Sequence, residues 1–120
     1  MNTKQIGHEY ERSFVKYLRN RGYLILARNV NFYSEAEIDI LASKDNKIYF
    51  FEVKKRESAF LQLREIVSYK QVIRQRLVVE KFKSDFIGNM YEILHILCIC
   101  LPKNKFYFVD IFDGRPYANI

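Results

Sequence analysis

The hydrophobic positions near the start of the chain recur at helical spacing. Tyr10, Phe14 and Leu18 return every four positions among charged residues, and Gly22 follows them. This spacing places apolar side chains on one face of a helix, and glycine is common just after a helix end. The pattern predicts an amphipathic first helix over about residues 2–21.

Three short apolar segments follow and are typical of β-strands. They cover residues 23–27, 37–42 and 48–54. We expect the first two to be buried and the polar stretch 28–35 to form a loop between them. The short polar turn at residues 44–47 predicts an antiparallel hairpin of the second and third strands.

The second half of the chain predicts a helix and two more strands. Between about residues 59 and 82, apolar residues recur at spacings of three and four, which indicates a long helix. Lys70 falls on this stripe, so we expect it to point inward. The run 93–101 predicts a fully buried strand, and 106–112 predicts the last strand. The residues of the helical stripe are Leu63, Ile66, Val67, Ile73, Leu77 and Val78.

The predicted order is helix, three strands, helix and two strands. A helix between buried strands indicates an α/β protein in which a mixed central sheet is flanked by helices. With 120 residues, of which 49% are hydrophobic, the chain can bury a real core. We expect residues 1–120 to form a single domain.

Charge and cysteine usage narrow the class of protein. The net charge of +6 and the sequence pI near 9.3 favour a polyanionic partner such as nucleic acid, although a solvated basic surface is the alternative. No apolar run is long enough for a membrane helix, and the N-terminus has no apolar signal-peptide core, so we expect a cytoplasmic protein without membrane contact. Cys98 and Cys100 share one strand face and suit a reducing compartment. His95 lies nearby, but no second cluster completes a zinc site, so we expect structural thiols.

Three charged residues lie on the predicted buried strands. Asp39 stands between two isoleucines, while Glu52 and Lys54 share one face of an apolar strand. Buried charges need compensation, and hard divalent cations prefer oxygen ligands. Asp39, Glu52 and the Val53 carbonyl could hold Mg²⁺ or Mn²⁺, with Lys54 beside a water or the phosphate. The alternative is a structural ion pair of Glu52 with Lys54 and a solvent-exposed Asp39.

Charges outside the strands extend this candidate site. Glu11 precedes Phe14 by three positions, so it projects from the apolar face of the first helix, whereas Glu9 belongs to the polar side. Basic residues follow the acids and occupy the second helix. An acidic metal centre with a basic rim suits a phosphodiester enzyme, because the rim binds the backbone. The rim residues are Lys55, Arg56, Lys70 and Arg74.

The order of these residues resembles the PD-(D/E)xK nuclease superfamily and, more narrowly, the YraN-like family, whose members are compared with Holliday junction resolvases. The resemblance implies a restriction-endonuclease-like fold. It also implies Asp39 and Glu52 as metal ligands, Lys54 as the catalytic lysine and Glu11 as an auxiliary acid. The matching segments are Gly7–Glu11, Tyr17–Asn29, Glu37–Ala42 and Phe50–Arg56, together with Lys70.

The sequence therefore predicts a metal-dependent endonuclease that hydrolyses DNA, with branched DNA as a candidate substrate. A junction substrate would favour a two-fold symmetric homodimer, because two sites must address two strands. Two other readings stay open. The chain could be a noncatalytic nucleic-acid-binding module on the same fold, or an assembly protein whose apolar C-terminal strands pair with a partner.

Overall fold

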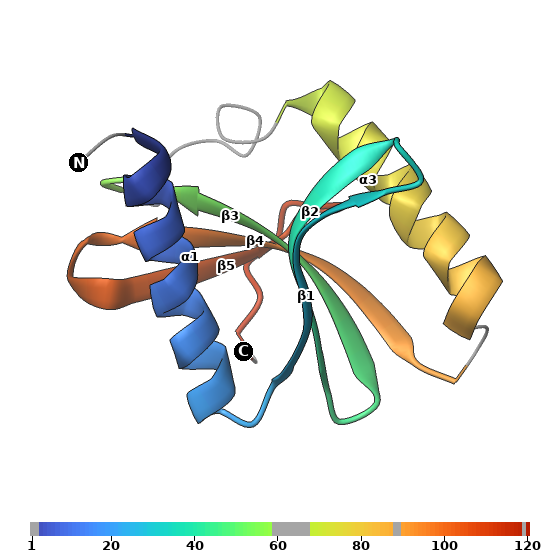
Figure 1. The fold of residues 1–120 in the computed structure, drawn as a ribbon, viewed down its shortest axis with the longest axis horizontal. Coiled ribbons are helices and arrows are strands. Elements are labelled where there is room, and N and C mark those ends of the chain that lie inside the picture. The colour runs from blue at the N-terminus through green and yellow to red at the C-terminus, as the bar shows by residue number, and fades with distance from the viewer. Residues whose placement is uncertain (1–2, 59–67, 88–89, 119) are drawn as a thin grey trace.

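A five-stranded sheet forms the centre of the molecule, with one helix on each of its faces (Figure 1). The computed structural model describes residues 3–58, 68–87, 90–118 and 120. The described α-helices are α1 (Thr3–Asn20) and α3 (Tyr69–Phe82). A short π-helix, η1 (Lys83–Ile87), follows α3, and a short 3₁₀-helix, η2 (Pro102–Asn104), follows β4. The strands are β1 (Leu24–Phe32), β2 (Ala36–Lys44), β3 (Lys47–Lys55), β4 (Glu92–Leu101) and β5 (Lys105–Asp110).

The strands lie in the sheet in their order along the chain. β1 with β2, β2 with β3, and β4 with β5 pair antiparallel, whereas β3 and β4 run parallel. A parallel pair needs a crossover connection, and α3 lies in that connection. The predicted mixed sheet flanked by helices is therefore confirmed, and so is the predicted β2–β3 hairpin.

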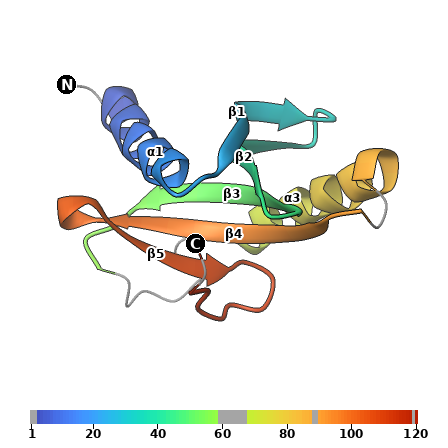
Figure 2. The same ribbon diagram turned by 90° about the horizontal axis from the view of Figure 1, so that it is seen from below.

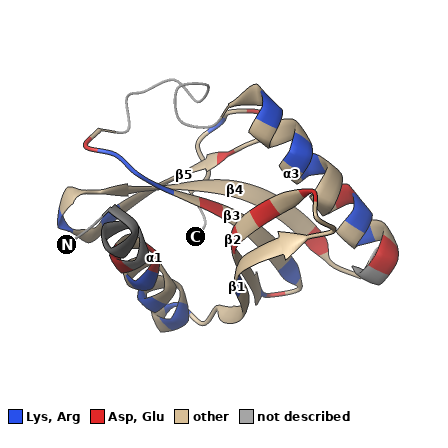
Figure 3. Cartoon of the chain, turned by 45° about the horizontal axis from the view of Figure 1, so that its top comes forward, with Lys and Arg blue, Asp and Glu red and all other residues tan. Residues whose placement is uncertain are grey.

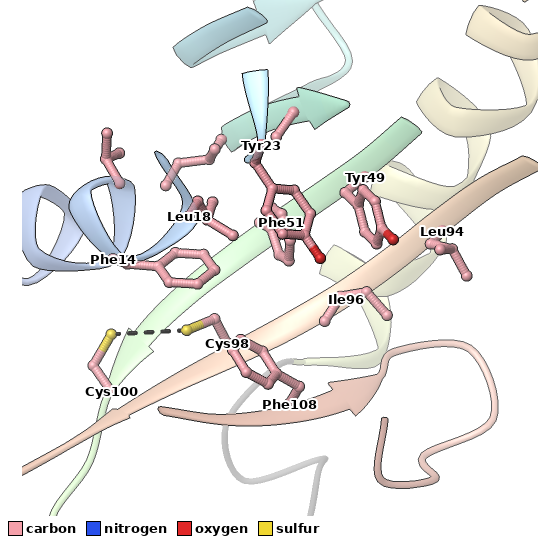
Figure 4. Close-up of a cluster of buried hydrophobic side chains, with 13 residues drawn as sticks. Phe14, Leu18, Tyr23, Tyr49, Phe51, Leu94, Ile96, Cys98, Cys100 and Phe108 are labelled. Atoms are coloured by element: carbon pink, nitrogen blue, oxygen red, sulfur yellow. Dashed lines mark hydrogen bonds between the residues drawn. The ribbon is translucent and has the colours of Figure 1, made fainter. Parts of the chain in front are cut away.

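Each face of the sheet is buried under a different helix. α1 packs Phe14, Val15 and Leu18 onto one face, where aromatic rings gather around Phe14 (Figure 4). α3 packs Val72 onto β4 and β5. Farther along α3, Val78 and Val79 contact β2 and β3. Because β4 is covered on both faces, its run of apolar residues is accounted for inside the sheet.

The two cysteines of β4 are free and buried on the α1 face. Their Sγ atoms lie 3.9 Å apart, as the dashed line in Figure 4 marks. His95 belongs to the opposite face, where its Nε2 lies 2.9 Å from Oε1 of Gln75. The histidine is therefore not placed beside the thiols, which fits the expectation of structural cysteines.

The first strand differs from the prediction in length and burial. β1 continues to Phe32, through most of the stretch predicted to be a loop, and the turn that follows holds Tyr33 and Ser34 at positive φ. β1 is an edge strand, so Leu24 and Leu26 stay 62% and 46% exposed. The prediction of a short buried strand was wrong because the apolar residues of an edge strand need not face a core.

The last strand ends earlier than predicted. β5 stops at Asp110, whose Oδ1 accepts hydrogen bonds from the backbone N–H groups of Phe112 and Asp113. An aspartate that binds the backbone two residues later starts a turn, so the chain leaves the sheet there.

Helix α3 begins later than predicted. The Ser68 side chain accepts a hydrogen bond from the backbone N–H of Gln71 at 3.1 Å, so Ser68 is the N-cap and the helix starts at Tyr69. Residues 59–67 of the predicted helix lie outside the described residues. No helix in the described ranges is long and apolar enough to cross a membrane.

The buried face of α3 also differs from the predicted stripe. Ile73 and Leu77 are 45% and 55% exposed, and Lys70 is exposed with them, so the inward orientation predicted for this lysine was wrong. Leu63, Ile66 and Val67 lie outside the described residues. Two glutamines face the sheet instead, and both Gln71 and Gln75 donate hydrogen bonds to Glu52. The residues buried from α3 are Val72, Gln75, Val78 and Val79.

Candidate active site

The candidate site lies where β2 and β3 separate. Their ladder runs from the hairpin turn to Ile40 opposite Phe51, and the same register would next pair Asp39 with Glu52. Instead, Oδ2 of Asp39 accepts a hydrogen bond from the backbone N–H of Val53 at 2.8 Å. Figure 2 shows β1 and the adjoining part of β2 rising away from β3 and β4. This separation of β2 from β3 beyond Ile40 and Phe51, called the fork below, leaves room for a carboxylate beside the edge of β3.

The backbone of β3 adds an oxygen to this position. In a strand, the N–H and C=O of one residue point to the same edge. Since the Val53 N–H points to Asp39, the Val53 carbonyl faces the fork as well. Asp39 and this carbonyl are therefore on the same side of β3.

Glu52 is buried and held by three donors. Only 4% of the residue is exposed. Nε2 of Gln71 donates to its Oε1 at 3.0 Å, and Nε2 of Gln75 donates to its Oε2 at 2.9 Å. Nζ of Lys54 lies 3.1 Å from Oε1. Glu52 and Lys54 thus meet on one strand face as predicted.

The acids at the fork interact electrostatically. Burial, then the negative charge of Glu52 and to a smaller extent that of Glu11, raise the pKa of Asp39 to about 8. The hydrogen bond from Val53 and the charge of Lys54 act in the opposite direction without offsetting these causes. Without a cation, the folded site therefore favours a proton on Asp39 over a third negative charge beside Glu52 and Glu11.

Glu11 brings a third carboxylate from α1. Its Oε2 is buried and has no hydrogen-bond partner within the described part of the chain, whereas Glu9 is exposed. The predicted preference for Glu11 over Glu9 agrees with this placement. A buried carboxylate oxygen without a donor is costly, so the position favours a cation.

The structure agrees only in part with the alternative in which Glu52 and Lys54 form a structural ion pair and Asp39 is exposed to solvent. Glu52 and Lys54 do form an ion pair. Asp39, however, is half-buried and interacts with Glu52 and Glu11 rather than lying at an exposed strand end. The ion pair therefore does not account for the remaining acids.

The donor set fits an ion that keeps several waters. Within the described residues, no three His, Cys, Asp or Glu side chains are arranged to hold a metal ion. Asp39, Glu52 and the Val53 carbonyl offer two carboxylates and one backbone oxygen on neighbouring strands. Mg²⁺ is commonly bound by one or two carboxylates, with water and phosphate oxygens completing its shell.

Basic residues approach the site from two elements (Figure 3). Lys55 and Arg56 follow the acids at the end of β3, and Nζ of Lys55 lies 4.9 Å from the centre of the Tyr10 ring. Lys70 and Arg74 are exposed on α3. Both line a hollow of about 340 Å³ between α3 and the β1–β2 hairpin, together with Asn31, Ser34, Glu35, Ala36, Glu37, Ser68, Gln71 and Gln75.

Sequence reasoning missed the two glutamines that bind Glu52. Gln71 and Gln75 are four positions apart, so they lie on one face of α3. A signal was present, because Gln75 is a polar residue three positions from the buried Val72 and Val78. The side chains that the sequence singles out for the site are all charged, and the Val53 contribution is its backbone carbonyl.

Comparisons with known proteins place the chain in a family. The model of the uncharacterised protein family UPF0102 matches residues 10–106. A UPF0102 protein of Dictyoglomus turgidum is 38% identical over 88% of this chain and 91% of its own length. Another, from Fusobacterium nucleatum, is 47% identical, but the match spans only 48% of each chain, about half the length of that relative.

One solved structure has the same fold. It is Hjc of Archaeoglobus fulgidus, described as a Holliday junction resolvase, with a TM-score of 0.59 and 19% identity over 87% of this chain and 76% of that one. This likeness confirms the restriction-endonuclease-like α/β class. The family match confirms the YraN-like resemblance seen in the sequence. On these grounds the chain belongs to the uncharacterised protein family UPF0102.

Proposed function

We propose that this protein is a metal-dependent endonuclease that hydrolyses DNA phosphodiester bonds with Mg²⁺ or Mn²⁺. The observation that carries the proposal is the electrostatic interaction of Asp39 with Glu52, Glu11 and Lys54. In addition, one buried carboxylate oxygen of Glu11 has no hydrogen-bond partner among the described residues. A divalent cation would take the place of the proton on Asp39 and stabilise the ionised carboxylates.

Each residue of the fork has a distinct role in this proposal. Asp39, Glu52 and the Val53 carbonyl would hold the ion. When bound, a divalent ion lowers the pKa of a coordinated water and neutralises charge on the phosphate. Lys54, paired with Glu52 and partly open to solvent, would orient the attacking water or stabilise the extra charge on the phosphate. Glu11 would serve as the auxiliary acid from α1.

The basic residues support a nucleic-acid substrate. Lys55 and Arg56 follow the acids on β3, while Lys70 and Arg74 line the hollow beside the Glu52-binding helix. Contacts of this kind hold the sugar–phosphate backbone and carry no sequence information by themselves. They would bring one phosphate to the fork.

A branched DNA substrate is the finer part of the proposal. Its support is the shared fold with a protein described as a Holliday junction resolvase. A four-way junction presents two equivalent strands, so a resolvase of this kind would act as a homodimer with one fork for each strand.

The test is cleavage of labelled duplex, single-stranded and four-way-junction DNA in Mg²⁺, Mn²⁺ or EDTA. We expect metal-dependent cutting by the wild-type protein. Asp39→Asn and Lys54→Met should each lower the rate by about 10²-fold or more, because both remove charge from the reacting centre. Asp45→Asn and Lys47→Met are the matched controls, since these residues lie at the other end of the β2–β3 hairpin.

Two results would contradict the proposal. Cutting that persists at the wild-type rate in Asp39→Asn would mean that another protein or another site is responsible. Tight DNA binding without cutting in every metal would instead favour the noncatalytic module. That module has weaker support, because carboxylates beside a bound phosphate only oppose binding.

A further inference from the structure

Behind Glu52 lies a buried polar chain that the proposed function does not use. Gln75 and His95 are 1% and 3% exposed, and they connect α3 with β4. Nε2 of Gln75 lies 2.9 Å from Oε2 of Glu52 and 3.3 Å from the carbonyl oxygen of Glu37. Oε1 of Gln75 lies 2.9 Å from Nε2 of His95.

The hydrogen-bonding chemistry fixes the direction of this chain. An ionised carboxylate only accepts hydrogen bonds, so Gln75 must turn its NH₂ group toward Glu52. Its carbonyl oxygen then faces the imidazole and needs a donor. His95 must therefore carry its proton on Nε2.

The other nitrogen of the ring agrees with this assignment. Nδ1 of His95 is buried and has no hydrogen-bond partner in the described ranges. An unpaired acceptor at this position is less costly than an unpaired N–H. Burial, and then the charge of Arg76, lower the pKa of His95 to about 4, so the ring is neutral near pH 7.

The hydrogen bond from Gln75 also determines which lone-pair position of the Glu52 carboxylate stays free. A carboxylate has about four lone-pair positions. Lys54 and Gln71 occupy two on Oε1, and Gln75 occupies one on Oε2. Among the contacts described, one lone-pair position on Oε2 is therefore left for a further ligand.

We propose that His95 and Gln75 are positioning residues that act in series on Glu52. His95 holds the amide of Gln75 in one orientation, and the amide holds the carboxylate with one Oε2 position free for the divalent ion. The inference rests on the proposed function for the ion, but the orientation of the chain can be tested without metal.

The first test measures Mn²⁺ affinity by electron paramagnetic resonance, together with thermal unfolding in EDTA. Gln75→Leu should weaken Mn²⁺ binding about 10- to 100-fold, as is usual when a group that orients a ligand is removed. His95→Phe should weaken it less. The double variant should bind no more weakly than Gln75→Leu alone, because His95 acts only through the glutamine.

The matched control is Val78→Ala, which removes a buried side chain from the same helix without touching Glu52. It should lower the unfolding temperature and leave Mn²⁺ affinity unchanged. Equal losses of affinity in Val78→Ala and Gln75→Leu would overturn the proposal, and so would additive effects in the double variant.

The second test is metal-free ¹⁵N NMR of the His95 ring. We expect a proton on Nε2 and none on Nδ1 at pH 7 in the wild-type protein, and a loss of this single tautomer in Gln75→Leu. A proton on Nδ1 in the wild type would overturn the proposal whether or not metal binds. If the wild type has the expected tautomer but neither binds Mn²⁺ nor cuts DNA, the endonuclease and the ion-positioning role are both overturned. The hydrogen-bonded series from Glu52 through Gln75 to His95 would still stand.

Discussion

The protonation of Asp39 is sensitive to folding. Its pKa is raised from 3.8 to about 8, first by burial and then by Glu52. At pH values between 3.8 and about 8, Asp39 is protonated in the folded chain and ionised in the unfolded chain. The free energy of unfolding therefore falls as the pH rises through this window.

Asp39→Asn should remove this dependence. In EDTA, the variant should be more stable than the wild type at pH 8.5, and the difference should shrink as the pH is lowered toward 5. Urea unfolding at a series of pH values measures it. The exposed Asp45→Asn serves as the control and should show no such trend. A difference between Asp39→Asn and wild type that stays constant with pH would contradict the raised pKa.

At the scale of single residues, charge on a predicted buried strand singled out Asp39, Glu52 and Lys54, and helical spacing added Glu11. In the structure these four residues interact electrostatically, while their roles in catalysis stay a prediction. Neutral Gln75 gave a weaker signal, because its role depends on contact with a residue 23 positions away. Lys70 was misplaced because its apolar neighbours in sequence, Ile73 and Leu77, turned out to be exposed.

Among the elements, α3 places both glutamines through its first turn. Ser68 caps the helix by accepting a hydrogen bond from the backbone of Gln71. Loss of the cap would allow the first turn to fray, and Gln71 lies in that turn while Gln75 lies one turn later. The helix start is thus coupled to the environment of Glu52.

Ser68→Ala should lower the free energy of unfolding by about 1 kcal/mol, the usual effect of removing an N-cap. Urea unfolding followed by circular dichroism measures this change. Ser84→Ala, at an exposed position in η1, is the control and should change stability little. If both variants lose the same amount, the cap contributes nothing specific.

The boundaries of the elements could be predicted only where local chemistry decides them. The β2–β3 hairpin was found because a polar turn separates two apolar runs, and its two turn residues, Asp45 and Asn46, do have positive φ. β1 and the start of α3 were missed. An edge strand tolerates polar residues, and a helix start depends on a cap that many serines could provide.

For the whole molecule, the order of elements was sufficient to predict the fold class. A helix that separates two groups of strands restricts the chain to a mixed sheet with covered faces. The solved neighbour agrees with that class. The rotation of α3, in contrast, was not predicted, because its buried face includes Gln75, a polar residue that the periodicity of apolar residues does not count.

The salt dependence of DNA binding belongs to the whole molecule as well. Lys70→Ala and Arg74→Ala should each reduce the slope of log affinity against log salt concentration by about 0.9, since each removes one phosphate contact. Fluorescence anisotropy with a labelled junction in EDTA gives the slope. Lys47→Ala is the control at the far end of β3. An unchanged slope in both rim variants would place the DNA elsewhere.

The parallel pairing of β3 with β4 has a consequence for how the chain folds. The β2–β3 hairpin closes through a two-residue turn, whereas β4 can join only after the chain has passed through α3. Local contacts generally form before distant ones. We therefore expect Asp39 and Glu52 to come near each other before Gln75 and His95, from the second half of the chain, reach the buried side of Glu52.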